Sequence, residues 1–355
     1  MFKLERITDF ARFKNSDSND IFKFIKPNDN DKLSEMKGFD LQDLLFYLDD
    51  YYLSLRDNIG LSEDVTFVLE LEFEYAMQER IEEKILHAGL FPQWMPSIDT
   101  SLSFGGEIDT PILKDEKKNW KQLQTVCDIV KPHAKIGPHS GGHVHVGAQV
   151  LGVDPKSWIN FAGLWSTYEN IIFRFGYGKF LTSRESIKGY ARPIAEIMRN
   201  DYEYVRGAYR EFKDEISLKD VKKQLTYGKY YAVNFNHVRN PERFSPRNTI
   251  EFRCPNGTLD ATVWQNNVNL FVKLLKYATS KDFDEDTINR RWEQISEKFT
   301  SLKWYDEIYL SQALELCDLL FDNNLDKVYF LKQYLKSFET TDKKITKAKP
   351  FTLKK

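Results

Sequence analysis

The sequence has few cysteines and little net charge, and each lack argues against a class of protein. Its three cysteines, Cys127, Cys254 and Cys317, are isolated and odd in number, with no CxxC spacing. We therefore expect buried thiols rather than disulfide partners, and the reducing cytoplasm fits this usage best. A net charge of −2 favours no polyanionic or polycationic partner, so the sequence does not predict a nucleic acid ligand.

Segments that would place the chain in or across a membrane are also missing. No apolar run approaches the roughly 18 residues that a membrane span requires. The first residues are interrupted by charges and lack the apolar stretch of a signal peptide.

There is no GxxxxGK[ST] phosphate-binding loop, so any ATP would have to be held by other elements. A length of 355 residues, 41% of them hydrophobic, predicts a soluble globular protein with a sizeable core.

The pattern of apolar residues divides the chain into four regions. Residues 1–62 read as a polar extension with one helix, expected over about 40–57. Residues 63–282 mix strands with helices and hold every motif of interest, whereas residues 283–339 have a helical pattern throughout. The tail 340–355 carries six lysines and few apolar side chains. We expect this basic tail to be solvated and disordered rather than a nucleic acid contact.

Three short stretches, 69–74, 142–146 and 250–253, alternate apolar with ionisable residues as a β-strand does. Side chains i and i+2 of a strand share a face, so the apolar residues would face a core and the ionisable ones a single polar surface. That surface would carry Glu70, Glu72, His143, His145, Glu251 and Arg253. Converging carboxylates and imidazoles suit a divalent metal, and a neighbouring arginine suits a phosphate or carboxylate ligand. The pattern predicts a metal-dependent enzyme.

These stretches also have simpler interpretations. Glu70, Glu72 and Glu74 could be the solvent face of an antiparallel strand, although like charges at this spacing repel and a bound cation would relieve the repulsion. The pair His143 and His145, bracketed by glycines in a valine-rich strand, is the more specific signal. It suits either a zinc hydrolase or a Mg²⁺ or Mn²⁺ nucleotide enzyme.

Further candidates lie outside the three stretches. Glu107 follows two glycines and suits a third carboxylate ligand, whereas Asp99 could instead cap a turn. The clustered amides around His237 could line a ligand pocket. Arginines suit bidentate contacts with phosphates or carboxylates, although a solvated loop is the expectation for Arg239. The other arginines in question are Arg184, Arg192, Arg243 and Arg247.

Five motifs occur in an order that resembles the amidoligase family, relatives of glutamine synthetase and glutamate–cysteine ligase. They are Glu-x-Glu, Asp-x-Ser-Leu with Gly-Glu-Ile-x-x-Pro, Gly-His-Val-His-Val, Arg with Tyr-Ala-Arg-Pro, and Ile-Glu-Phe-Arg with Gly-Thr-Leu. The resemblance covers about residues 64–280 and leaves the flanking regions outside. It implies an α+β fold with a curved, mainly antiparallel sheet of the glutamine-synthetase-like type, backed by helices.

The resemblance also implies a reaction. ATP would phosphorylate a carboxylate to an acyl phosphate, and an amine would displace the phosphate to give an amide. Glu72 and Glu107 would share one Mg²⁺ or Mn²⁺ ion, while Glu70, His143 and Glu251 would hold another. The substrates would be a small-molecule or peptide carboxylate and an amine, which no residue identifies.

The remaining roles that the resemblance implies concern catalysis and the nucleotide. His145 would approach the nucleotide phosphates or the substrate, and Arg253 would stabilise the substrate carboxylate or the transferring phosphoryl group. Glu251 would take part in catalysis beside Arg253. Three more arginines are candidates for phosphate contacts: Arg184, Arg192 and Arg247.

The sequence departs from the family pattern at two positions. Leu69 stands where the family usually has a glycine before the glutamate pair, and Thr249 stands where glutamine synthetases have an arginine. Two other classes of function also remain open. One is a zinc hydrolase built on His143, His145 and a carboxylate, and the other is an inactive scaffold or binding protein of the same fold.

Overall fold

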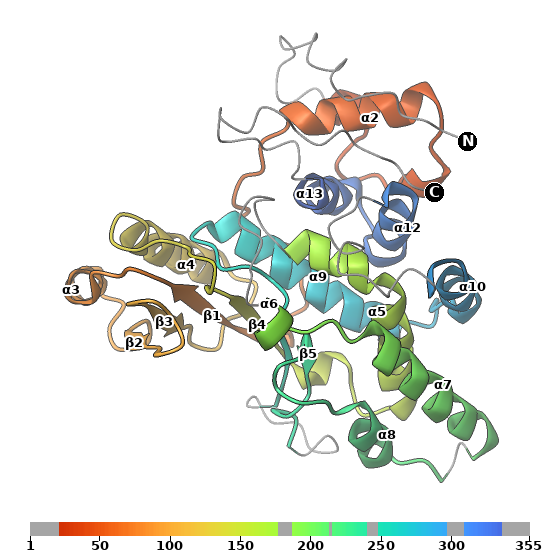
Figure 1. Cartoon of the computed structure of the whole chain (residues 1–355). Coiled ribbons are helices and arrows are strands. Elements are labelled where there is room, and N and C mark those ends of the chain that lie inside the picture. The colour runs from red at the N-terminus through yellow and green to blue at the C-terminus, as the bar shows by residue number, and fades with distance from the viewer. Residues whose placement is uncertain (1–20, 177–186, 213–214, 240–247, 297–308, 336–355) are drawn as a thin grey trace.

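A computed structural model of the chain describes residues 21–176, 187–212, 215–239, 248–296 and 309–335. It has a mixed α/β architecture in which one sheet of six strands is backed by helices (Figure 1). The strand order is β2-β3-β1-β4-β6-β5, and every neighbouring pair is antiparallel. The prediction of a mainly antiparallel sheet with helices is confirmed.

The strands are short and formed by segments with alternating apolar residues. Their bounds are β1 Phe67–Phe73, β2 Pro96–Ile98, β3 Gly106–Asp109, β4 Gly142–Gly147, β5 Val233–Asn234 and β6 Thr249–Phe252. The helices between and before the strands are α1 Ile21–Phe24, η2 Leu33–Glu35, α2 Phe39–Asp50, α3 Gln78–His87, α4 Lys117–Val130, η3 Ala148–Val150, α5 Pro155–Gly176, α6 Ile187–Tyr190, α7 Ala195–Glu211 and α8 Leu218–Leu225. The helices after β6 are α9 Ala261–Thr279, α10 Glu285–Ile295, α12 Leu310–Leu320 and α13 Asn324–Tyr334.

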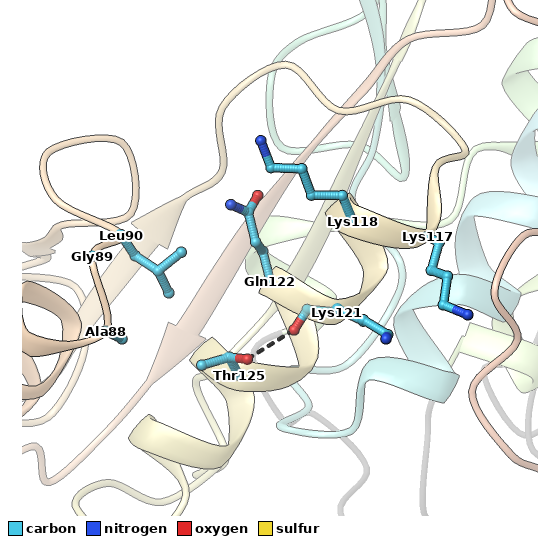
Figure 2. A pocket seen from close by; sticks show the side chains of 8 residues that line it. All are labelled: Ala88, Gly89, Leu90, Lys117, Lys118, Lys121, Gln122 and Thr125. Atoms are coloured by element: carbon cyan, nitrogen blue, oxygen red, sulfur yellow. Dashed lines mark hydrogen bonds between the residues drawn. The ribbon is translucent and has the colours of Figure 1, made fainter.

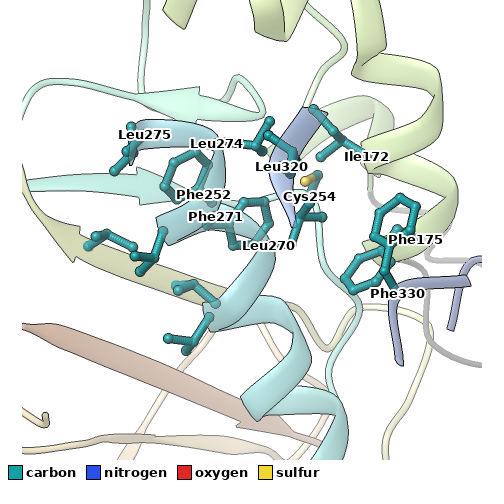
Figure 3. Close-up of a cluster of buried hydrophobic side chains, with 14 of the residues drawn as sticks. Ile172, Phe175, Phe252, Cys254, Leu270, Phe271, Leu274, Leu275, Leu320 and Phe330 are labelled. Carbon is teal, nitrogen blue, oxygen red and sulfur yellow. The ribbon is translucent and has the colours of Figure 1, made fainter. Parts of the chain in front are cut away.

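One face of the sheet is closed by helices α4, α5 and α9. The ring of Trp120 on α4 stacks on Phe67 of β1, with centroids 5.1 Å apart. The ring of Phe252 on β6 stacks on Phe271 of α9 at 4.2 Å (Figure 3). The same ring lies 5.7 Å from that of Trp165 on α5, between centroids. Apolar side chains of β1, β4 and β6 are fully buried against this layer. The opposite face is therefore the one on which the alternating polar residues lie.

The two ends of the described chain pack together above the helical layer (Figure 1). The Asp318 carboxylate of α12 accepts hydrogen bonds from the backbone N–H groups of Leu33, at 3.0 Å, and Ser34, at 2.8 Å. Lys327 of α13 is fully buried and lies 2.8 Å from the same carboxylate. The predicted tail 340–355 lies outside the described residues, and the division into four regions stays a prediction.

Two expectations drawn from what the sequence lacks can be compared with this fold. Cys127, Cys254 and Cys317 are all buried free thiols, as predicted. Among the helices that the structure describes, none combines the length and apolarity that crossing a membrane would take.

Candidate active site

Antiparallel pairing places the ionisable residues of four strands side by side on the face away from the helices. Because paired residues point to the same side of a sheet, the register decides which side chains are neighbours. The register pairs are Glu72 with Glu107, Glu70 with Asp109, Glu70 with His143, and His145 with Glu251. The single polar surface expected from alternation is therefore present.

Glu70 lies at the centre of this polar face and contacts both histidines of β4. Its Oε2 is 2.5 Å from Nδ1 of His143, and its Oε1 is 2.6 Å from Nε2 of His145. Burial by itself would raise the pKa of Glu70, but the hydrogen bonds and charges of the two imidazoles lower that pKa far below its usual range. Burial would lower the pKa of His145, but its hydrogen bond to Glu70 and the nearby carboxylates raise it overall.

Glu251 is almost fully buried, and its two oxygens have different neighbours. Oε1 accepts from the Arg253 guanidinium and lies 3.7 Å from Nδ1 of His143. Oε2 accepts from the Asn234 amide at 2.6 Å and lies 3.0 Å from Nε2 of His237. Burial opposes ionisation, yet the hydrogen bond from His237 and the nearby basic groups lower the pKa of Glu251 to about 2. Glu251 is therefore a carboxylate held in its charged form.

Glu72 and Glu107 form the third part of the face. The backbone N–H of Gly141 donates to Oε2 of Glu72, while Oε1 of Glu72 lies 3.5 Å from Nε2 of His143. That Nε2 is buried and has no hydrogen-bond partner among the described residues. Burial and the charges of the surrounding carboxylates raise the pKa of Glu107 to about 7. Both features suit a site that holds a cation between these side chains.

Three groups on the polar face have ligand atoms close enough together to hold a metal ion. In each, one atom per residue lies within 4.8 Å of the others. The groups are Glu70, Glu72 and Glu107; Glu70, His143 and Glu251; and His145, His237 and Glu251. The first two resemble the ligand sets that the family resemblance implies, except that Glu70 joins Glu72 and Glu107. The third was not expected.

Of the arginines predicted to contact phosphates or carboxylates, the structure describes some and not others. Arg253 lies on the polar face, where Nε donates to the carbonyl of Tyr190 at 3.1 Å as well as pairing with Glu251. Arg192 is exposed, and its backbone bonds to that of Tyr230 and Ala232, just before β5. Two other predicted phosphate contacts, Arg184 and Arg247, lie outside the described residues.

The sequence pattern does not predict several residues of the polar face, or gives them a lesser role. Asp109 follows Glu107 by two positions in β3, so alternation alone could have indicated it. No local signal in the sequence links Asn234 to Glu251 or Thr249 to His145, because those contacts come from strand pairing. Asp99 caps a turn, as one interpretation held, since its Oδ1 accepts from the backbone N–H of Ser101 at 2.8 Å.

The chain matches the model of a known protein family. A family model described as "putative amidoligase enzyme" matches residues 14–275, which is most of the chain. The chain belongs to this amidoligase family. That membership places it among enzymes of the ligase kind. The amidoligase match begins well before residue 64, so the prediction that the N-terminal region lies outside the resemblance is wrong. No curated protein matches the chain at a significant level.

A separate hollow on this amidoligase is distinct from the polar face. It measures about 600 Å³ and lies where the end of α3 meets the first turns of α4 (Figure 2). Helix α4 packs on the apolar side of the sheet through Trp120, so the hollow belongs to the helical layer. Its basic lining residues are Lys117, Lys118 and Lys121, and none of the face carboxylates or histidines lines it.

Proposed function

We propose that this amidoligase joins a carboxylate to an amine in an ATP- and Mg²⁺-dependent reaction that passes through an acyl phosphate. The observation that carries the proposal is the convergence of two possible metal-ligand sets beside an arginine on one sheet face. These residues are Glu70, Glu72, Glu107, His143, Glu251 and Arg253. The substrates we expect are a small-molecule or peptide carboxylate and an amine.

The chemistry of the ligand atoms fits hard divalent cations. Mg²⁺ takes oxygen ligands and prefers one or two carboxylates, with water and phosphate oxygens completing its shell. The group of Glu70, Glu72 and Glu107 offers only carboxylate oxygens. The pKa of Glu107, raised to about 7, reflects crowding of negative charge that a bound cation would relieve. The unpartnered Nε2 of His143 offers a further ligand atom beside Glu72.

Bound Mg²⁺ would neutralise the phosphate charges and align the transferring phosphoryl group. The chain itself supplies the groups around that position. Arg253 can turn from Glu251 toward a phosphoryl or carboxylate oxygen, because its guanidinium offers several donors in one plane. His145, whose Nε2 lies 2.6 Å from Glu70, would lie beside the phosphates or the substrate. Arg192, and Arg184 and Arg247 outside the described residues, are further candidates for the phosphates.

Two substitutions complete the proposed reaction. A carboxylate oxygen of the first substrate attacks the γ-phosphorus of ATP, the bond to the β–γ bridging oxygen breaks, and ADP leaves. The amine nitrogen then attacks the carbonyl carbon of the acyl phosphate, and phosphate departs as the carbon–oxygen bond breaks. The proton lost from the nitrogen can leave with the phosphate. Because both steps form or release negatively charged phosphoryl groups, both gain from cationic residues on the face.

Hydroxylamine can test the proposed intermediate without knowledge of the natural amine. The protein would be incubated with Mg²⁺, ATP, hydroxylamine and a panel of amino acids and short peptides as carboxylates. We expect at least one carboxylate to give a hydroxamate together with an equal amount of ADP, and Glu251→Ala to give neither. Release of ADP without hydroxamate for every carboxylate that stimulates turnover would contradict an acyl phosphate.

A further inference from the structure

His237 brings an additional imidazole to the polar face. Its Nε2 is 3.0 Å from Oε2 of Glu251. Its ring lies against that of His145, with centroids 5.2 Å apart and an angle of 72° between the planes. The ligand atoms of His145, His237 and Glu251 all lie within 4.8 Å of one another. Two imidazoles and one carboxylate make this group chemically different from the carboxylate-rich groups beside it.

Glu251 can serve this group without giving up its other contacts. The Arg253 guanidinium contacts Oε1, and Nδ1 of His143 lies 3.7 Å from the same oxygen. His237 and the neutral amide of Asn234 contact Oε2. A cation bound through Oε2 would therefore approach the carboxylate from the side away from the arginine. An oxygen with two lone pairs can accept from the amide and still bind an ion.

The ring of His145 is oriented by a hydroxyl group. Its Nδ1 lies 3.1 Å from Oγ1 of Thr249, which leaves Nε2 directed at the carboxylates. Metal-binding histidines commonly make such a bond through the nitrogen that does not bind the metal, because it fixes both ring orientation and tautomer. Thr249 is the residue at which this sequence departs from the arginine of glutamine synthetases.

The backbone at His237 is also fixed. The side chain of Asn234 accepts a hydrogen bond from the backbone N–H of Asn236 at 2.9 Å. The N–H of Val238 donates to the carbonyl of Phe235 at 3.0 Å, and both of these apolar residues are fully buried. His237 thus projects from a turn that is anchored on either side, which lowers the entropic cost of using it as a ligand.

From this geometry we infer that His145, His237 and Glu251 bind a further divalent cation of the Mn²⁺, Co²⁺ or Zn²⁺ class. Imidazole ligands favour these metals, whereas Mg²⁺ prefers oxygen. The side chain of His237 is 48% exposed, so the ion has room for water or a substrate oxygen at its open positions. The inference goes beyond the ligase proposal, which uses the two other groups, and it shares Glu251 with one of them.

Binding of Co²⁺ to the full chain tests this site, because its absorption in the visible reports imidazole ligands. The protein is stripped with EDTA and titrated with Co²⁺ in a large excess of Mg²⁺, which occupies the carboxylate-rich groups. We expect one Co²⁺ per chain, with affinity lowered at least about tenfold in His237→Ala and lowered to a smaller degree in Thr249→Val. His87→Ala removes an exposed histidine of α3 and serves as the matched control, with affinity unchanged.

Glu72→Gln separates this inference from the ligase proposal. It alters only the carboxylate-rich group, so it should lower Mg²⁺-dependent ATP binding and leave Co²⁺ binding intact. Equal Co²⁺ affinity in the wild type, His237→Ala and His87→Ala would overturn the inference, and so would the absence of Co²⁺ binding under excess Mg²⁺. Co²⁺ binding that depends on His237, in a protein without any response to Mg²⁺ and ATP, would support the inference and refute the ligase alone.

Discussion

The carboxyl group of Glu107 has a raised pKa, which measurements at different pH values can test. Its pKa is raised from 4.5 to about 7, first by burial and then by the charges of Asp109, Glu70, Asp99 and Glu72. A group whose folded-state pKa is raised binds a proton on folding, so its contribution to stability is greatest below its unfolded pKa. That contribution is lost as the pH rises through the folded-state pKa.

Removal of Glu107 should therefore change how stability depends on pH. In EDTA, we expect the wild type to lose stability relative to Glu107→Gln as the pH rises from about 5 to about 8. The measurement is urea unfolding of both proteins across that range. If the two stability curves run parallel, the carboxyl does not titrate near neutral pH and this account of the face is wrong.

The same titration should appear in metal binding. A ligand must lose its proton before it binds a cation, so Mg²⁺ affinity should rise by about tenfold between about pH 6 and about pH 8. Isothermal titration of the wild type with Mg²⁺ at these two values measures the change. In Glu107→Gln the affinity should be lower and the pH dependence weaker. An affinity that is independent of pH in the wild type would exclude Glu107 as a ligand.

Substitution of Arg253 should strengthen metal binding but weaken catalysis. Its guanidinium pairs with Glu251, and so competes with a cation for that carboxylate. We expect Arg253→Gln to bind Mg²⁺ several-fold more tightly and to lower kcat by about a hundredfold or more, because it loses stabilisation of developing charge. Mg²⁺ titration and the hydroxamate assay measure the two effects. Weaker Mg²⁺ binding in the variant would contradict a competitive role for Arg253.

The strands that carry most of the site can be predicted from the sequence, whereas the short strand β2 cannot. Alternation predicts strands over 69–74, 142–146 and 250–253, which overlap β1, β4 and β6. The signal is strong because the apolar side chains lie on one face only, packed against the helical layer. The short strand β2 was missed because three residues cannot show alternation.

Which side chains meet across the sheet could be predicted only in part. Alternation determines that Glu70 and Glu72 share a face, but the register of β1 against β3 and β4 determines their partners. Register follows from long-range packing and pairing, which a local pattern does not contain. The carboxylates and histidines were therefore predictable as a set. The contacts of His237 with Glu251 and of Thr249 with His145 were not.

Gly142 tests how closely β4 must be held against the helical layer. A Cβ at this position would lie 2.6 Å from the carbonyl oxygen of Asn256 and 2.9 Å from the buried ring of Trp264. We expect Gly142→Ala to destabilise the fold by about 1–3 kcal/mol and to weaken Mg²⁺ binding, because the adjacent His143 would shift. Urea unfolding and Mg²⁺ titration measure these effects.

Gly207 provides the matched control for that substitution. It lies in α7, and a Cβ there would meet no atom within 4 Å. Gly207→Ala should raise stability by about 0.5–1 kcal/mol, because alanine loses less backbone entropy than glycine in a helix. If Gly142→Ala were as stable as Gly207→Ala, the close packing of β4 described above would be wrong.

At the scale of the whole molecule, the first and last described segments are joined through a buried ion pair. Lys327 is fully buried and its Nζ lies 2.8 Å from Oδ1 of Asp318, which also bonds to the backbone of η2. Removal of one partner from a buried pair leaves an uncompensated charge. We therefore expect Asp318→Ala to lower the free energy of unfolding by about 3–5 kcal/mol, measured by urea denaturation.

Asp322 is the comparison for that loss. Its side chain is 86% exposed, and it lies 3.5 Å from the ammonium of Lys273. An exposed pair of this kind contributes little, so Asp322→Ala should change stability by less than about 0.5 kcal/mol. A loss in Asp318→Ala as small as that in Asp322→Ala would mean that the N-terminal segment and the C-terminal helices are not coupled through this contact.

The proposed function requires that the polar face of the sheet bind Mg²⁺ and ATP together. Thermal unfolding with ATP, in Mg²⁺ and in EDTA, tests this for the wild type and Glu251→Ala. A ligand that binds only the folded state stabilises it by about 2.7 kcal/mol at a hundredfold excess over Kd. We predict a rise in Tm that requires Mg²⁺ and is lost in the variant. Absence of any response to nucleotide, or an equal response in Glu251→Ala, would contradict the claim.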